Sequence, residues 1–110
     1  MLDITMFCDA VVYLNAYADY QMMRIDKAEF ERYSWQYGWT VDGCGKETLR
    51  NCTAEYTVSY EGKQGLMEWH LKSGTSNGEM LRIYFLWDKK MKKVVIGYMP
   101  DHLPTRKDKT

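Results

Sequence analysis

The stretch MLRIYFLWDKKMKKVVIGYM, residues 80–99, decides the fold class. Large apolar side chains occupy every second position of its first half, which is the period of a strand with one buried face. The lysine-rich centre is typical of an exposed turn, and a second apolar run rich in β-branched residues follows it. We therefore predict a β-hairpin with strands at 80–87 and 93–99. The core face of its first strand should consist of Leu81, Ile83, Phe85 and Trp87.

Two shorter segments upstream show the same alternation. Residues 54–60 separate into a polar and an apolar side, residues 61–65 supply a glycine-containing turn, and residues 66–72 form the next strand. In that strand we expect one face made of Met67, Trp69 and Leu71. Because strand side chains alternate between two faces, the other face carries Glu68, His70 and Lys72.

The first third of the chain has the helical period instead. Apolar residues recur at the spacing of one helical face, at Phe7, Ala10, Val11, Leu14, Ala18 and Met22. Asp26 and Glu29 have the spacing of a capping box for a second helix, which Gly38 ends. Residues 42–51, rich in glycine and polar residues, indicate a loop. We predict a single α+β domain over residues 1–110, with two N-terminal helices packed on a four-stranded antiparallel sheet.

The composition limits the classes of protein to consider. The 110 residues suffice for one hydrophobic core, and the 45% apolar content argues against disorder. No segment is long enough to cross a membrane, and Asp3 and Asp9 interrupt the apolar start that a signal peptide needs. The three cysteines, without CxxC spacing, indicate reduced thiols in a cytoplasmic protein with no metal or other cofactor. We expect Cys8 in the core and Cys44 in an exposed loop.

Charge is balanced overall but divided along the chain. Residues 1–55 hold five Lys or Arg and nine Asp or Glu, whereas residues 56–110 hold ten and six. A basic sheet half can attract phosphate even in a neutral protein. The run at 89–93 supplies four of those ten basic residues, however, and is equally typical of a solvated turn.

The polar sides of the predicted strands carry groups suited to acid–base chemistry. One sheet face, away from the helices, should collect Glu68, His70, Lys72, Arg82 and Tyr84, and the last strand leads to His102. Cleavage of RNA by its own 2′-hydroxyl needs such groups. A base removes the hydroxyl proton, a cation neutralises the phosphate and an acid protonates the leaving 5′ oxygen, all without a metal. An aromatic ring beside them, such as Tyr84, can stack a base of single-stranded RNA.

The order of these segments resembles the C-terminal half of the RelE family of toxins, the messenger-RNA interferases of toxin–antitoxin pairs. The resemblance covers residues 66–104 and rests on four runs: WHLKS at 69–73, LRIYF at 81–85, VVIGY at 94–98 and DHL at 101–103. Two helices ahead of the sheet also fit that family. The resemblance implies a RelE-like fold and a toxin ribonuclease whose partners are RNA or the ribosome and a cognate antitoxin.

The resemblance also implies a role for each matching residue. Lys72 would be the base or a phosphate ligand, Arg82 would stabilise the transition state, and His102 would be the general acid. Glu68 is an alternative base. The residues that contact the RNA would be His70, Tyr84 and Tyr98.

Other interpretations stay open. Arg82 can simply pair across the sheet with Glu68 or Glu79, and His102 can be a loop residue without a task. The chain can be a small non-catalytic inhibitor, encoded by a phage or mobile element, that binds one host protein such as a defence nuclease. Its acidic helical half and many Met and Tyr residues suit such a contact. It can also be a toxin-like domain that binds RNA without cleaving it, with a strong dependence on salt.

Overall fold

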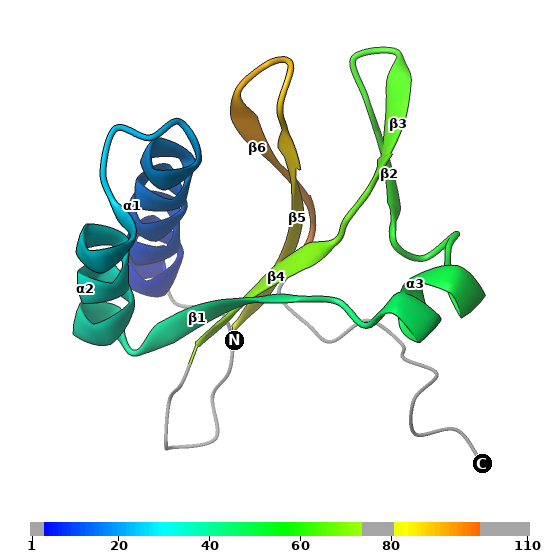
Figure 1. Ribbon diagram of the computed structural model, residues 1–110. Helices are drawn as coiled ribbons and strands as arrows, with labels where there is room; N and C mark the ends of the chain where they lie inside the picture. Colours follow the sequence, from blue (N-terminus) through cyan, green and yellow to red (C-terminus); the bar gives the residue numbers. More distant parts are fainter. Residues whose placement is uncertain (1–3, 74–80, 100–110) are drawn as a thin grey trace.

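Two N-terminal helices pack on one face of a four-stranded antiparallel sheet, which confirms the predicted fold class (Figure 1). The computed structural model describes residues 4–73 and 81–99. The sheet has the strand order β1-β4-β5-β6, and β2 and β3 form a separate hairpin. In chain order the elements are α1 (Ile4–Gln21), α2 (Lys27–Tyr37), β1 (Trp39–Gly43), α3 (Lys46–Asn51), β2 (Thr57–Tyr60), β3 (Lys63–Leu66), β4 (Trp69–Ser73), β5 (Arg82–Asp88) and β6 (Lys93–Tyr98).

The helix ends follow the predicted signals. The Asp26 side chain accepts a hydrogen bond of 2.8 Å from the backbone N–H of Glu29, and Gly38 ends α2 in the left-handed conformation with φ of 71°. Glycine adopts this conformation without a steric cost, so the chain can turn directly into β1. The prediction for Cys8 is wrong, because it lies on the solvent side of α1 and is exposed.

The membership of the main sheet differs from the prediction. The predicted strand 54–60 is not part of it: its second half is β2, which pairs with β3 in the separate hairpin. The turn predicted at 61–65 is shorter, since β3 begins at Lys63. The fourth strand of the main sheet is β1, which extends into the predicted loop 42–51, and α3 occupies most of the rest of that loop.

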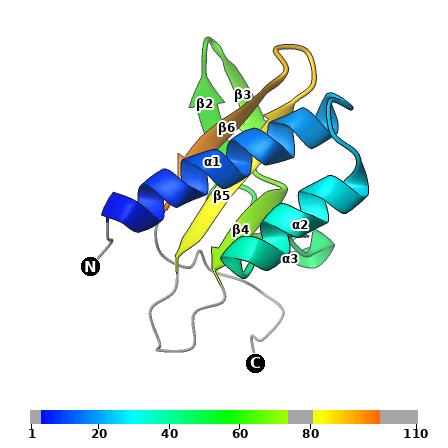
Figure 2. The same cartoon turned by 90° about the vertical axis from the view of Figure 1, so that its left-hand side faces the viewer.

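A hydrophobic core fills the space between the helices and the sheet (Figure 2). Leu71, Ile83 and Phe85 are fully buried there, as predicted for their faces. The ring of Tyr17 from α1 meets that of Phe85 edge to face, with centroids 5.2 Å apart. Trp87 packs at the margin of this core.

A second, smaller core lies on the other side of the sheet, where Figure 2 shows the β2–β3 hairpin and α3 behind the strands. Its buried members are Cys52, Tyr56, Met67 and Tyr84. Met67 was expected to share the face of Leu71. It lies ahead of β4, which begins at Trp69, and its side chain fills the second core instead.

Polar contacts hold the β2–β3 hairpin against the β5–β6 turn. The buried carboxylate of Asp88 accepts hydrogen bonds from the Tyr60 hydroxyl at 2.8 Å and from the backbone N–H of Met91 at 2.9 Å. It also pairs with the Lys63 ammonium at 3.0 Å. Lys93 forms a second ion pair with Glu61. Within the described parts of the chain, no helix combines the length and apolarity needed to span a bilayer.

Candidate functional site

The register of β4 and β5 brings two predicted site residues together. Lys72 and Arg82 are direct cross-strand partners in the antiparallel pair, and Thr40 of β1 is the partner of Lys72 on its other side. Directly paired residues project to the same face of a sheet. The three side chains therefore form one row on the face away from α1 and α2.

A second row lies beside the first on the same face. His70 is paired with Tyr84 on β5 and with Asp42 on β1, and Tyr84 is paired in turn with Tyr98 on β6. We call the accessible polar and charged residues of the two rows the polar face; they are Thr40, Asp42, His70, Lys72 and Arg82.

Two like charges meet in the first row. Lys72 and Arg82 are both half-exposed, and within residues 4–73 and 81–99 neither takes part in an ion pair. The alternative pairing of Arg82 with Glu68 is thus absent, and Glu79 lies outside the described residues. Like charges placed directly opposite each other destabilise a strand pair. An anion bound between the two side chains would remove that repulsion.

Tyr84 has a different environment from the one expected for an RNA-stacking residue. It is only 2% exposed, because the second core covers it. Its ring packs edge to face against Tyr56, with centroids 5.6 Å apart, and lies 5.5 Å from the His70 ring. This burial leaves no ring face for a base, so Tyr84 positions His70 and the second core instead. Tyr98, at 40% exposure, keeps an accessible ring.

Within the polar face, His70 is the residue that contacts the thiol of Cys44. The Cys44 Sγ is 3.7 Å from the His70 Nδ1, in reach of a weak sulfur hydrogen bond. Burial, together with the negative charge of Glu68, raises the pKa of the Cys44 thiol to about 11. The thiol is therefore neutral at physiological pH and is a poor nucleophile. Cys44 is half-buried rather than exposed, which corrects the expectation from its glycine-flanked sequence.

Of the remaining predicted residues, Glu68 lies outside the two rows of the polar face, ahead of β4. Glu68 is exposed, and its backbone carbonyl accepts a hydrogen bond of 2.8 Å from the N–H of Cys44. His102 lies outside the described residues, so its approach to Arg82 stays a prediction.

Two members of the polar face, Thr40 and Asp42, were missed by the sequence analysis. Their side chains lie within 3.5 Å of each other on β1, between Thr40 Oγ1 and Asp42 Oδ2. The alternation of Trp39 and Val41 with these polar residues is a strand signal, but it is only four residues long. Asp42 adds a carboxylate directly opposite His70.

Known proteins give no independent identification of this site. No family model, curated protein or solved structure matches the chain. Among residues 4–73 and 81–99, no group of three His, Cys, Asp or Glu side chains is arranged to hold a metal ion. The geometry of the polar face is therefore the basis for assigning a function to the chain.

Proposed function

We propose that the chain is a RelE-like toxin ribonuclease, which cleaves single-stranded RNA on the polar face through attack of the RNA 2′-hydroxyl on the adjacent phosphate. The observation that carries the proposal is the direct cross-strand pairing of Lys72 with Arg82. Two directly paired cations without an ion-pair partner among the described residues repel each other in the unbound protein, and a doubly charged phosphorane would neutralise them.

Each group of the polar face has a role in this reaction. Lys72 and Arg82 contact the non-bridging oxygens, whose charge rises in the transition state. Arg82 is suited to two-point contact because its guanidinium presents donors in a planar fork. His70 is the imidazole of the second row proposed to take the 2′-hydroxyl proton, and Asp42 is paired directly opposite it on β1.

The leaving 5′ oxygen requires a proton. His102, which follows β6 in the sequence, is the proposed donor, and Glu68 is the alternative base to His70. Tyr98 is the exposed aromatic ring available for stacking a neighbouring base. In this scheme the chain works in the cytoplasm on messenger RNA, and a cognate antitoxin holds it inactive.

The test measures cleavage of an end-labelled single-stranded RNA in the presence of EDTA. The wild type should leave a 2′,3′-cyclic phosphate or 3′-phosphate on one product and a 5′-hydroxyl on the other. Lys72→Ala and Arg82→Ala should each slow cleavage by about 10²- to 10³-fold. Lys90→Ala and Arg32→Ala remove exposed cations that lie elsewhere and should leave the rate unchanged.

The same variants can be compared in cells. Induced expression of the wild type should arrest growth, and Arg82→Ala or His102→Ala should relieve the arrest at equal protein levels. Normal growth together with intact cellular RNA, or cleavage that Lys72→Ala and Arg82→Ala leave untouched, would overturn the proposal.

A second candidate is a non-catalytic inhibitor that binds one host protein. It is favoured by large apolar side chains on the helical side of the molecule, since Trp35 is 86% and Met23 89% exposed. Such side chains are typical anchors of protein interfaces. This function predicts a stable complex with one protein at physiological salt and no RNA cleavage. Substitution of Trp35 by Ala should then weaken the complex, while Arg82→Ala should not.

A further inference from the structure

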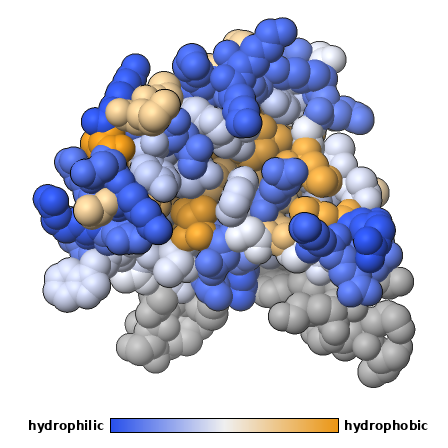
Figure 3. Space-filling model, viewed as in Figure 1, coloured by the Kyte–Doolittle hydropathy of each residue, from blue (hydrophilic) through white to orange (hydrophobic). Residues whose placement is uncertain are grey.

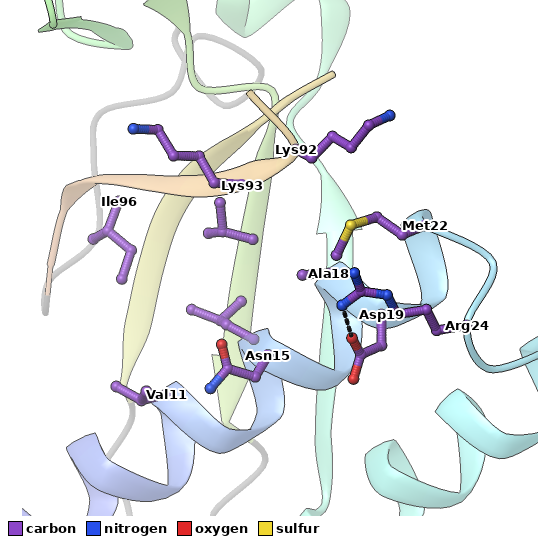
Figure 4. Close-up of a pocket in the computed structure, with 11 residues that line it drawn as sticks. Val11, Asn15, Ala18, Asp19, Met22, Arg24, Lys92, Lys93 and Ile96 are labelled. Atoms are coloured by element: carbon purple, nitrogen blue, oxygen red, sulfur yellow. Dashed lines mark hydrogen bonds and ion pairs between the residues drawn. The ribbon is translucent and has the colours of Figure 1, made fainter. Parts of the chain in front are cut away.

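A groove of about 480 Å³ runs between α1 and β6 at one edge of the main sheet. In Figure 4, Val11, Asn15 and Ala18 line it from α1, and Lys93 and Ile96 lie across from them on β6. A further hollow of about 520 Å³ shares Met22, Arg24 and Lys92 with it and extends toward Lys89. Figure 3, which is viewed as Figure 1 and faces the side of β1 and β4 instead of this groove, shows apolar surface in the middle of that view with hydrophilic surface on both flanks.

The helix wall of the groove belongs to a longer stripe that the protein's own core does not use. Side chains separated by alternating steps of four and three residues lie along it: Ile4, Cys8, Val11, Asn15, Ala18 and Met22. Ile4 is 72% and Val11 39% exposed, whereas the core is served by another stripe that includes Ala10, Tyr13 and Tyr17. Steps of four and three residues are the spacing of a coiled-coil seam, which receives the side chains of a second helix.

The strand wall of the groove is poorly suited to pairing with an added strand. β6 is an edge strand, but Lys93 lies at its start and a register shift leaves Gly97 as an extra residue near its end. Lysines and bulges on edge strands discourage pairing with another strand. Val94 and Ile96 still offer an apolar surface to a helix lying against α1.

The charges of the groove select the chemistry of that helix. Arg24, Lys92 and Lys93 line it, and Lys89 follows in the adjoining hollow; Lys93 is paired with Glu61, whereas Lys92 and Lys89 have no ion-pair partner among the described residues. Its acidic lining residue is Asp19, which already pairs with Arg24 at 3.5 Å. The rim therefore has an excess of positive charge, which attracts an acidic segment. A second copy of this chain would bring the same lysines to the contact and be repelled.

We propose that the α1–β6 groove binds an acidic amphipathic helix of a partner protein. Apolar side chains of that helix fill the seam along α1 and contact β6, and its flanking Asp or Glu side chains pair with the lysines of the rim. Asn15, a polar residue within the seam, fixes the register by requiring a polar partner opposite it. This surface lies on the opposite side of the sheet from the polar face, so the inference does not depend on RNA cleavage.

The probe is a synthetic helical peptide of about three heptads, with Leu at the seam positions, one Asn to meet Asn15, and Glu at the flanking positions. A second peptide carries Lys in place of Glu, and a third has the first composition in scrambled order. Isothermal titration calorimetry with the full chain should detect binding of the acidic peptide only.

Matched variants locate the binding. Val11→Glu and Lys92→Glu, which alter groove residues, should each lower the affinity for the acidic peptide by about tenfold or more. Val12→Glu and Lys90→Glu alter exposed residues that do not line the groove and should leave affinity unchanged. The Lys peptide should bind Lys92→Glu better than it binds the wild type.

Three results would overturn the proposal. In the first, the acidic peptide binds no better than the scrambled peptide. In the second, Val11→Glu leaves the affinity for the acidic peptide unchanged. In the third, analytical ultracentrifugation would find a dimer of the wild type that Val11→Glu dissociates, which would make a second copy the occupant of the groove. RNA cleavage is read in a separate assay, so failure here leaves the proposed ribonuclease function as it was.

Discussion

Ile83 and Arg82 are neighbours in β5 that face opposite sides of the sheet, and substituting them should have opposite consequences for stability. Ile83 is fully buried between the sheet and the helices, paired across the strands with Leu71. Arg82 is half-exposed on the polar face. The contrast tests the assignment of faces on which the functional argument depends.

The expected loss of unfolding free energy follows from the apolar groups that each side chain buries. Ile83→Ala removes three carbons, about 2.4 kcal/mol at about 0.8 kcal/mol for each buried methylene. The cavity that remains raises the loss to about 3–4 kcal/mol. Ile83→Val removes one carbon and should cost about 1 kcal/mol. Arg82→Ala should stay within about 0.5 kcal/mol of the wild type, because it removes an exposed group and also a like-charge contact.

Urea denaturation followed by circular dichroism measures these differences directly. In thermal denaturation of a chain of this length, Ile83→Ala should lower Tm by roughly 15 °C, while Arg82→Ala should leave it nearly unchanged. The assignment of faces would be refuted if Arg82→Ala cost as much as Ile83→Ala. It would equally be refuted if Ile83→Ala cost less than about 1 kcal/mol.

Three further predictions concern the second core and the hairpin contact. Hydrogen bonds from Met91 N–H and Tyr60 and the ion pair with Lys63 hold the pKa of Asp88 below its usual value near 4. Because the folded-state pKa is depressed, these contacts stabilise the fold above about pH 4, and the stabilisation is lost as the pH falls further. Urea titrations from pH 5 to pH 2 should therefore show a steeper loss of unfolding free energy in the wild type than in Asp88→Asn. Parallel curves would contradict this prediction. Gly97→Ala should lower the free energy of unfolding by about 1–3 kcal/mol, because the new Cβ would overlap the Met67 sulfur and approach the Val58 Cβ to 3.0 Å. In a double-mutant cycle, Met67→Ala should reduce this loss, and additive losses from the two substitutions would contradict the prediction. Burial raises the pKa of the Cys44 thiol, so mass spectrometry at pH 8 should find iodoacetamide on exposed Cys8 long before it is found on Cys44. The reverse order would be inconsistent with the burial of Cys44.

The parts of the fold that the sequence predicted have long, regular periods. α1 and α2 show the helical spacing over several turns, with a capping side chain and a terminal glycine at α2. In β5 and the residue before it, Leu81, Ile83, Phe85 and Trp87 alternate along the buried face, and the first three are fully buried. Each such pattern is local, so it can be recognised without knowledge of the partner segment.

The errors arose where long-range contacts decide the structure. β1 is short, and its pairing with β4 is what makes it a strand, although its neighbours in sequence are glycine and polar residues. The segment before β4 continues the alternation of a strand, yet Met67 packs in the second core together with Tyr84. That second core is built by α3 and the β2–β3 hairpin, and nothing in the local pattern around Tyr84 reveals that they cover it.

The candidate site was predictable in part for the same reason. Alternation within each strand placed Lys72 and Arg82 on one side, and the observed register makes them direct partners. The addition of Thr40 and Asp42 required the strand order, which single-sequence patterns do not specify. The burial of Tyr84 required knowledge of the second core, which covers part of the same face.

The most direct test of the central claim is a map of where a nucleic-acid backbone contacts the chain. A single-stranded oligonucleotide with 2′-deoxyribose cannot be cleaved by 2′-hydroxyl attack, so its binding can be followed by NMR amide shifts. The largest shifts should fall on Thr40, Lys72 and Arg82, weaken with rising salt, and disappear in the Lys72→Ala, Arg82→Ala double variant. Shifts confined to α1 and α2, or shifts that the double variant retains, would contradict the claim that the paired cations of β4 and β5 hold RNA phosphate.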